Sequence, residues 1–344
     1  MTPRLPIRRA LSGDNCWALA ALLGLIGVSA LGAEPPVAAA TAPLAIHSLL
    51  TAAASAPGGA LVAAGERGHI LLSRDGGNHW RQATVPVDVL LTGACFVNDR
   101  VGYVVGHDES ILSTADGGES WQIVHFAPDA RQPFLDVSCA ADGDVLVVGA
   151  YATLARAENQ GHSFRISELI AAPLVTARKV ARMDDDAELE QPHLNAVARA
   201  ADGLLYVAGE GGHLYRSDDG GSHWISLPSP YAGSFFAVLT IGESTVLAAG
   251  LRGHLYRSDD RGLHWTSIET GSDVLLDGAT VLPDGRIVIV GLAGVVLVSD
   301  DGGHSFKRLR MADRKGLAAV AVGPQGPIVV GENGARRLTL EKRN

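Results

Sequence analysis

An eight-residue box with a carboxylate near its centre recurs along the chain. The first copy reads SRDGGNHW at residues 73–80, and five later copies follow the pattern Ser/Thr-x-Asp-x-Gly-x-(Ser/Thr/His)-(Trp/Phe). A carboxylate beside a hydroxyl group or an imidazole could carry acid–base chemistry. The third positions are Asp75, Asp116, Asn159, Asp219, Asp260 and Asp301, and the eighth positions are Trp80, Trp121, Phe164, Trp224, Trp265 and Phe306.

The spacing of the boxes argues for a structural role. Their third positions are separated by 41, 43, 60, 41 and 41 residues, which is typical of an array of similar units. Six similar copies in separate units cannot converge on one substrate. We therefore expect the aspartate to accept backbone N–H groups across a turn, the glycine to adopt a positive φ, and the aromatic ring to pack into the unit. No catalytic residue is predicted.

Each unit contains four short apolar runs that are bounded by turn residues. In the second unit these runs are residues 91–97, 100–106, 110–115 and 120–126. Four strands in about 40 residues make one propeller blade. A glycine lies ten residues before the third position of each box, and one more such glycine extends the series to a seventh, incomplete unit. These glycines are Gly65, Gly106, Gly149, Gly209, Gly250, Gly291 and Gly331. The predicted fold is an all-β, seven-bladed β-propeller.

The two ends of the chain raise separate questions. The last unit has three strands, and we expect residues 37–44 to complete it as an amino-terminal fourth strand. Residues 1–33 carry arginines, an apolar run and small residues, which predicts a secretory signal peptide, with an uncleaved membrane anchor as the alternative. The propeller would then span residues 34–344. Export predicts a periplasmic location, or the thylakoid lumen in a photosynthetic host.

Composition narrows the class of partner. The chain is 47% apolar and 19% charged, so it can bury a core, and its net charge of −9 disfavours nucleic acid as a partner. Cys95 and Cys139 occupy equivalent first-strand places in adjacent units. A disulfide between them and two buried thiols both stay open.

The boxes resemble the Asp box, or bacterial neuraminidase repeat. The recurring GxxGxIxxSxDGGxxW pattern makes the chain most similar to the photosystem II stability and assembly factor family of chloroplasts and cyanobacteria. This resemblance covers nearly the whole mature chain. It implies an exported, non-enzymatic propeller that binds membrane-protein subunits during assembly, here as a protein-binding assembly factor for an envelope or thylakoid membrane complex.

Two rival functions can be compared with this expectation. A glycoside hydrolase of the sialidase-like class carries the same boxes, but the early Arg-Ile-Pro signature of sialidases is missing. A metal site at His69, His213 and His254 is disfavoured because equivalent places in blades one, four and five do not meet at one point. We predict no metal, no cofactor, no small-molecule substrate and a monomeric protein.

A partner is expected on the face opposite the boxes, where the second-to-third and fourth-to-first connections lie. The longer interval between the third and fourth boxes places an insert at residues 171–193 on this face, with basic residues followed by acidic ones. Solvated loops are the alternative reading for each position. The candidate contact residues are Arg67, Glu109, Arg131, Tyr151, Tyr231 and Arg252, and in the insert Arg178, Lys179, Arg182, Asp184, Asp185 and Asp186.

Overall fold

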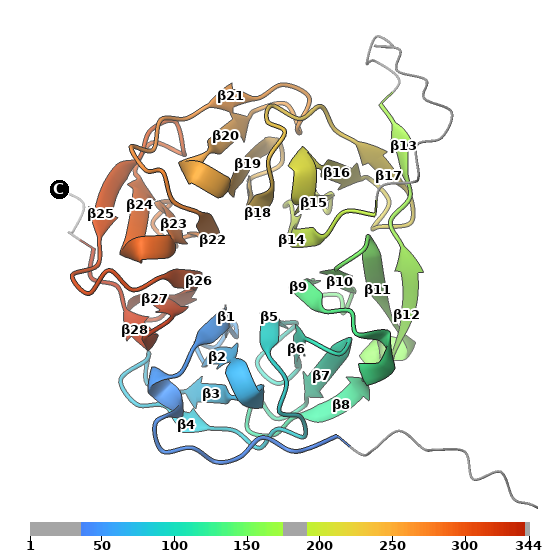
Figure 1. Cartoon of the computed structure of the whole chain (residues 1–344), viewed down its shortest axis with the longest axis vertical. Coiled ribbons are helices and arrows are strands. Elements are labelled where there is room, and N and C mark those ends of the chain that lie inside the picture. The colour runs from blue at the N-terminus through green and yellow to red at the C-terminus, as the bar shows by residue number, and fades with distance from the viewer. Residues whose placement is uncertain (1–35, 175–190, 341–344) are drawn as a thin grey trace, which may run out of the picture. The chain divides into compact units, whose positions relative to one another are not determined.

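A computed structural model describes residues 36–174 and 191–340 of the chain. Seven antiparallel sheets stand around a central axis as the blades of a propeller, which confirms the predicted fold (Figure 1). No helix in these two ranges is long and apolar enough to cross a bilayer. The predicted signal peptide at residues 1–33 lies outside the described residues.

The strands of each blade follow one another outward from the axis (Figure 1). Blades one and two contain β1 (Leu50–Ser55), β2 (Leu61–Gly65), β3 (Ile70–Ser73), β4 (Arg81–Gln82), β5 (Leu91–Phe96), β6 (Gly102–Gly106), β7 (Ser110–Thr114) and β8 (Gln122–His125). Blades three and four contain β9 (Phe134–Cys139), β10 (Val145–Gly149), β11 (Thr153–Glu158), β12 (Ser163–Glu168), β14 (Leu194–Arg199), β15 (Leu205–Gly209), β16 (Leu214–Ser217) and β17 (Trp224–Ser226). Blades five to seven contain β18 (Phe235–Ile241), β19 (Thr245–Gly250), β20 (Leu255–Ser258), β21 (Thr266–Ser267), β22 (Leu276–Val281), β23 (Ile287–Gly291), β24 (Val295–Ser299), β25 (Lys307–Arg310), β26 (Leu317–Gly323), β27 (Gly326–Gly331) and β28 (Gly334–Arg337).

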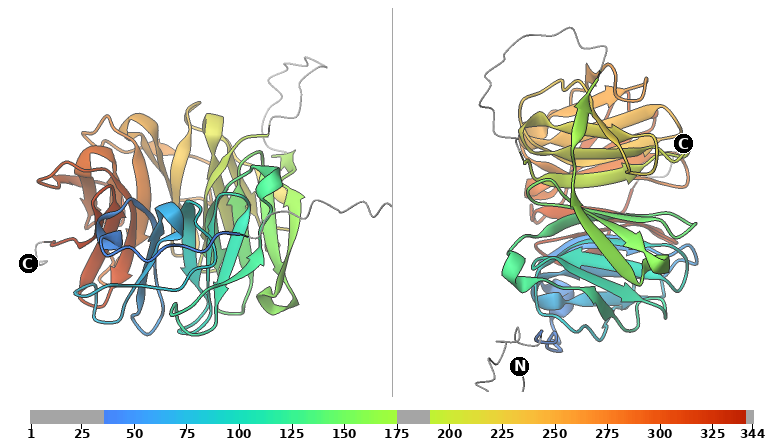
Figure 2. Two further views of the ribbon diagram at one scale, coloured as in Figure 1. Left: turned by 60° about the horizontal axis from the view of Figure 1, so that its bottom comes forward. Right: turned by 90° about the vertical axis from the view of Figure 1, so that its right-hand side faces the viewer.

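The core lies between neighbouring blades. The second strand of a blade is covered on both sides, so β6 (GYVVG) and β23 (IVIVG) are buried along their whole length. This explains why these strands are continuous apolar runs rather than alternating ones. Leu247 of blade five packs in one cluster with Ile289 of blade six, and Val105 of blade two packs with Val147 of blade three. The strands run from one face of the ring to the other (Figure 2).

The glycine that ends each second strand is required by close packing. A Cβ atom at Gly65 would lie under 3 Å from the carbonyl oxygen of Leu49, and one at Gly250 equally close to that of Ser234. The equivalent glycines of the other blades meet the backbone just before the inner strand in the same way. The repeat glycine therefore lets the end of the second strand approach the start of the first.

Every inner strand begins with the same irregularity. Its register against the second strand shifts at the second residue, which is Thr51 in β1, Thr92 in β5 and Asp277 in β22. A bulge redirects the side chain at that position. In all seven blades this residue lines the central channel.

The prediction that residues 37–44 complete blade seven is wrong. Among the described residues, blade seven has three strands, and residues 36–44 form none. They lie against blade one, where Ala39 N donates to Val85 O at 3.0 Å and Ala42 N to Gln82 Oε1 at 2.9 Å. The short 3₁₀ helix η1 (Ala45–His47) packs on β28 instead, which directs the preceding residues away from its edge.

Side chains join the first and last blades in place of a strand. Arg337 Nη2 of blade seven donates to Gly76 O at 2.7 Å and to Asn78 Oδ1 at 3.0 Å in the first box. The inner strands β26 and β1 also pack side by side. Gln325 Nε2 of blade seven also donates to Asp75 O at 3.4 Å. Ring closure therefore depends on packing and on these side-chain hydrogen bonds.

The insert begins with a strand that the sequence did not suggest. β13 (Ala171–Pro173) pairs in parallel with β17, which gives blade four a fifth, outermost strand (Figure 1). Ala171 lies opposite Trp224, the aromatic residue of the fourth box. The start of the insert is thus attached to the outside of blade four.

Candidate functional site

The box turns connect the third and fourth strands, and their hydrogen bonds explain the motif. Asp75 Oδ1 accepts the backbone N–H of Asn78 at 3.1 Å and that of His79 at 2.9 Å, and it also accepts the hydroxyl of Ser73 at 2.9 Å. Its other oxygen lies 2.6 Å from His79 Nδ1. The backbone and side-chain hydrogen bonds of His79 hold the pKa of Asp75 well below its ordinary value. The carboxylate is therefore fully used in holding the turn.

The same network recurs in four other boxes. Asp219 and Asp260 contact a histidine Nδ1 at 2.6 Å, and Asp116 and Asp301 contact a serine hydroxyl at 2.6 Å. In each of them the serine or threonine two residues earlier also donates to the carboxylate. The histidine and serine of the motif are interchangeable because either can donate one hydrogen bond to the outer oxygen.

The third box departs from this pattern. Asn159 Nδ2 contacts Ser163 Oγ at 2.9 Å, and Asn159 and Gln160 adopt positive φ values of 51° and 58°. The aromatic residue remains in place, with Phe164 meeting Tyr103 edge-on at 5.8 Å between ring centroids. The turn is kept without a carboxylate, which is further evidence that the box needs no acid chemistry.

The opposite face is built by a second repeated contact. The residue after each repeat glycine donates its N–H to the carbonyl just before the inner strand, as in Glu66 to Leu49 at 3.0 Å and Glu210 to His193 at 2.9 Å. These bonds hold the second-to-third turns beside the fourth-to-first connections. Arg67, Arg131, Tyr151, Tyr231 and Arg252 all belong to these segments, as the sequence predicted.

Four of these residues combine exposure with a left-handed backbone. Arg131, with φ of 52°, is one, and the other three share a single turn position. Arg67, Tyr151 and Arg252 occupy the same turn position in blades one, three and five, with φ of 55°, 53° and 56°, and all are exposed. Blade four has Gly211 there, with φ of 64°. A non-glycine residue in this left-handed region costs about 1 kcal/mol. These side chains are carried at a position where glycine fits without strain.

Exposed apolar side chains lie on the same face. Tyr151 is 48% exposed and contacts His193 edge-on at 5.0 Å, while Leu251 is 37% and Leu292 is 44% exposed. Tyr231 is half-buried and stacks against His254 at 4.2 Å. The face thus offers aromatic and aliphatic surface beside isolated charges, which suits recognition of a polypeptide.

The remaining candidates differ in their accessibility. Glu109 is buried, and its Oε2 lies 3.2 Å from His125 Nε2, so the structure gives it an internal contact. Arg131 is exposed at the end of the short 3₁₀ helix η3 (Pro128–Ala130). The charged residues of the insert, Arg178, Lys179, Arg182, Asp184, Asp185 and Asp186, lie outside the described residues.

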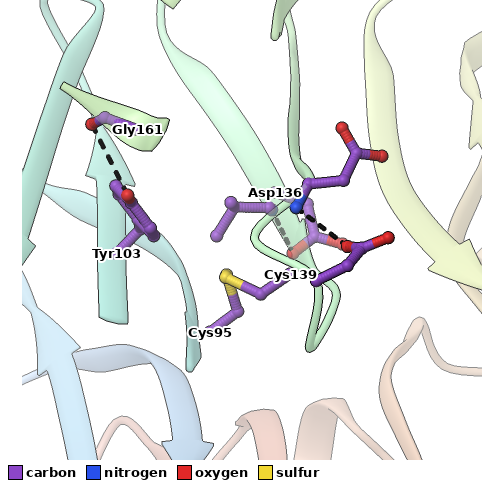
Figure 3. Close-up of a disulfide and its surroundings, with 8 residues drawn as sticks. Cys95, Tyr103, Asp136, Cys139 and Gly161 are labelled. Carbon is purple, nitrogen blue, oxygen red and sulfur yellow. Dashed lines mark hydrogen bonds between the residues drawn. A yellow bond between two sulfur atoms is a disulfide. The ribbon is translucent and has the colours of Figure 1, made fainter. Parts of the chain in front are cut away.

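A disulfide joins the inner strands of blades two and three. Cys95 in β5 and Cys139 in β9 have Cα atoms 5.7 Å apart and are bonded (Figure 3). The sequence left this bond and two free thiols open, because equivalent strand positions do not fix the distance between blades. Cys139 lies on the same strand as Asp136, three residues further along β9 (Figure 3).

The central channel contains two carboxylates that the sequence reading missed. Asp136 lines the wall from β9, and Asp277 lines it from the bulge of β22. Burial raises the pKa of Asp136 to about 6, against two backbone hydrogen bonds that lower it. Burial, and then the charge of Asp136, raise the pKa of Asp277 to about 7. The third residue of the inner strand is small in other blades, as at Ala52 and Gly93, whereas blade three has Asp136 there. This difference in the repeat is the sequence signal that could have identified Asp136.

The three aligned histidines lie in separate blades. His69 Nδ1 contacts Ser48 Oγ at 3.1 Å, and burial lowers its pKa. His213 and His254 contact the hydroxyls of Tyr215 and Tyr256. In the described part of the chain, no three His, Cys, Asp or Glu residues gather as a metal-binding group.

Comparisons with known proteins support the resemblance inferred from the boxes. Residues 72–173 match the sequence model of the family described as photosynthesis system II assembly factor YCF48, which confirms that resemblance over this part of the chain. No curated protein matches the chain.

Solved structures match the whole propeller at low identity. A structure of YCF48 bound to D1 peptide is 16% identical with a TM-score of 0.65, and the match covers 89% of this chain and 100% of that one. YCF48 from Cyanidioschyzon merolae is 16% identical with a TM-score of 0.62, covering 86% and 97% of the two chains. The WD40 β-propeller domain of Doa1 is 13% identical with a TM-score of 0.67, covering 89% and 97%. At these identities, the structural matches show a shared fold and nothing further.

Proposed function

We propose that the protein is a non-enzymatic assembly factor that binds a polypeptide segment of a membrane-complex subunit on the face opposite the boxes. The family match at residues 72–173 supports the assembly role, and a relative of the same fold is described as bound to a D1 peptide. In this proposal the mature protein works after export, in the periplasm or, in a photosynthetic host, in the thylakoid lumen.

The strained and exposed side chains of the binding face carry the proposal. Arg67, Tyr151 and Arg252 each hold a left-handed backbone where Gly211 shows that glycine is accommodated. Asp108 and Ala293 hold the same left-handed position in blades two and six, so the turn itself requires this conformation. Those two residues are half-buried, whereas the three candidates expose long side chains there. The three residues stand in blades one, three and five, so an extended segment lying across the face can meet more than one of them.

The channel and the boxes support the non-enzymatic part. The box carboxylates are occupied by their own turns. The two channel carboxylates line a cavity of about 220 Å³, below the size of usual small-molecule sites, and its wall has no arginine or tyrosine among the described residues. A sialidase-like hydrolase needs arginines to bind the sugar carboxylate and a tyrosine in its nucleophile pair, so the channel does not supply the site that this alternative requires.

Glycine substitutions provide a direct test. The triple variant Arg67→Gly, Tyr151→Gly and Arg252→Gly removes the three side chains and relieves the backbone strain, so its melting temperature should stay equal or rise. Capture of subunits from detergent-solubilised membranes of the source organism, after mild cross-linking, should fall at least tenfold. A fluorescent D1 peptide provides a second probe for binding.

A matched control lies on the other face. Gln160 also has a positive φ, at 58°, and is exposed in the third box turn. Gln160→Gly makes the same chemical change away from the proposed face and should leave capture unchanged. Full capture by the triple variant would contradict the proposal, as would release of sugar from a glycan substrate by the wild-type protein.

A further inference from the structure

The bulged residues of the inner strands connect neighbouring blades through their donor groups. Thr51 donates its hydroxyl to Leu91 O, Thr92 donates to Phe134 O at 2.7 Å, and Asn195 donates its Nδ2 to Phe235 O at 2.8 Å. In each case the acceptor is the backbone carbonyl of the first inner-strand residue in the next blade. The donor groups of these side chains therefore make hydrogen bonds within the protein.

The same three side chains line the central channel. Asn195 Oδ1 accepts no hydrogen bond from the described residues, and a threonine hydroxyl that donates keeps its lone pairs. The hydrogen-bond donors of Thr51, Thr92 and Asn195 are therefore paired with protein carbonyls, whereas their oxygen atoms can still accept hydrogen bonds or bind a cation. A wall of oxygen acceptors is complemented by water or by a cation.

Asp277 occupies the equivalent bulge in blade six without such a connection. As an ionised carboxylate it has no proton to donate to the carbonyl of Leu317 in blade seven, and it forms no hydrogen bond or ion pair with the described residues. Asp277 is largely enclosed by protein, keeps some accessible surface, and lines the channel. A buried carboxylate without a partner is unfavourable unless a positive charge compensates it.

Asp136 adds the second charge from blade three. Its two oxygens accept the backbone N–H groups of Val137 at 2.8 Å and Val197 at 2.9 Å, which fix its position and leave further lone pairs free. The charge of Asp136 is felt by Asp277, so the two carboxylates share one electrostatic environment. They are the charged side chains of the channel wall in the described part of the chain.

We propose that the central channel binds a hydrated divalent metal cation between Asp136 and Asp277, with Asn195, Thr51 and Thr92 as neutral oxygen partners. Two carboxylates and neutral oxygens are the donor set of a hard cation such as Ca²⁺ or Mn²⁺. The cavity of about 220 Å³ leaves room for several water ligands. This site lies on the axis of the ring and is separate from the proposed protein-binding face.

Calorimetric titration with calcium chloride and with manganese chloride tests the proposal. The probe protein is residues 36–344, stripped with EDTA, at pH 8. One cation per chain should bind and raise the melting temperature, and binding should weaken at least tenfold at pH 5.5, where protons compete for the carboxylates. Potassium chloride at equal ionic strength should not reproduce the effect.

Variants separate this site from weak surface binding. Asp277→Asn should abolish the cation response, while Asp273→Asn, which removes an exposed carboxylate four residues earlier, should retain it. Asp277→Thr, which copies Thr51 and Thr92, serves as a second variant if the asparagine variant does not fold. An equal cation response in wild type and Asp277→Asn, or no response in wild type, would overturn the proposal without affecting the proposed protein binding.

Discussion

Aspartate has two opposite roles in this protein, set by the groups around it. In the boxes it lies at the surface, accepts backbone N–H groups and has a lowered pKa, as at Asp219. In the channel it is enclosed, and its pKa is raised to about 7 at Asp277. Hydrogen-bond donors favour the charged form in the first case, and burial disfavours it in the second. The two groups therefore respond to different ranges of pH.

Asp219→Ala should destabilise the fold without impairing partner binding. The change leaves the N–H groups of Ser222 and His223 without their acceptor, so we expect a loss of about 1–2 kcal/mol in the free energy of unfolding. Urea unfolding followed by tryptophan fluorescence measures this loss. Weakened capture of the partner at unchanged stability would show that the box has a role in binding.

Asp277→Asn should change the dependence of stability on pH, measured without divalent cations. A carboxyl group whose pKa rises from 3.8 to about 7 on folding binds its proton more tightly in the folded state. Its contribution is therefore complete below pH 4 and is lost as the pH rises through about 7, by about 4 kcal/mol in all. The variant should lose less stability across this range. Parallel profiles for the two proteins, from urea titrations at each pH, would argue against a strained Asp277.

The insert between blades three and four shows how an element can be attached to a blade and yet be separable from it. β13 pairs with the outer edge of blade four, while Pro192 O accepts the N–H of Ala152 in blade three at 2.8 Å. Both ends of the insert are thus held by the propeller. The residues between these ends carry the two blocks of charge.

Replacing residues 175–190 with a short Gly/Ser linker should keep the fold and weaken partner capture. The linker leaves β13 and Pro192 in place, and changes in loop length cost little. The melting temperature should stay within a few degrees of wild type, while capture should fall severalfold because the charge blocks are lost. Capture equal to that of wild type would show that the insert does not choose the partner.

The disulfide between β5 and β9 can be counted by mass. Unreduced protein comprising residues 36–344, alkylated in denaturant, should take up no label, and the reduced protein should take up two. Reduction should lower stability by a few kcal/mol because the bond closes a loop across a sequence separation of 44 residues. Two labels on the unreduced protein would contradict the bond.

Much of the fold could be predicted because each repeat is marked by short sequence motifs whose structure depends on neighbouring residues. The boxes and the repeat glycines mark turns whose geometry depends on residues close in sequence, such as Asp75 and His79. The site is less predictable because Asp136 and Asp277 come from distant parts of the sequence and line one channel only when the blades form a ring. The closure prediction failed for a related reason, since the place of residues 37–44 depends on η1 packing against β28.

At the scale of the whole molecule, the seven blades form a ring whose neighbours depend on one another. Each apolar cluster is shared by two blades, as with Leu247 and Ile289. A blade therefore buries its faces only when both neighbours are present, and stability grows with the number of completed interfaces. The seam between blades one and seven is the interface whose two sides lie farthest apart in the chain.

That seam imposes an order on biosynthesis. Arg337 and Gly76 are 261 residues apart, so the arginine fork cannot form until the polypeptide as far as Arg337 has left the ribosome, or has crossed the membrane if the chain is exported. Earlier blades can stack as they emerge, but the faces of blades one and six stay open to water until the last blade arrives. An interrupted chain that lacks blade seven, from residue 317 onward, would keep this open arc, with two apolar blade faces available for unwanted association. Blade seven thus decides when the apolar faces of blades one and six are both covered.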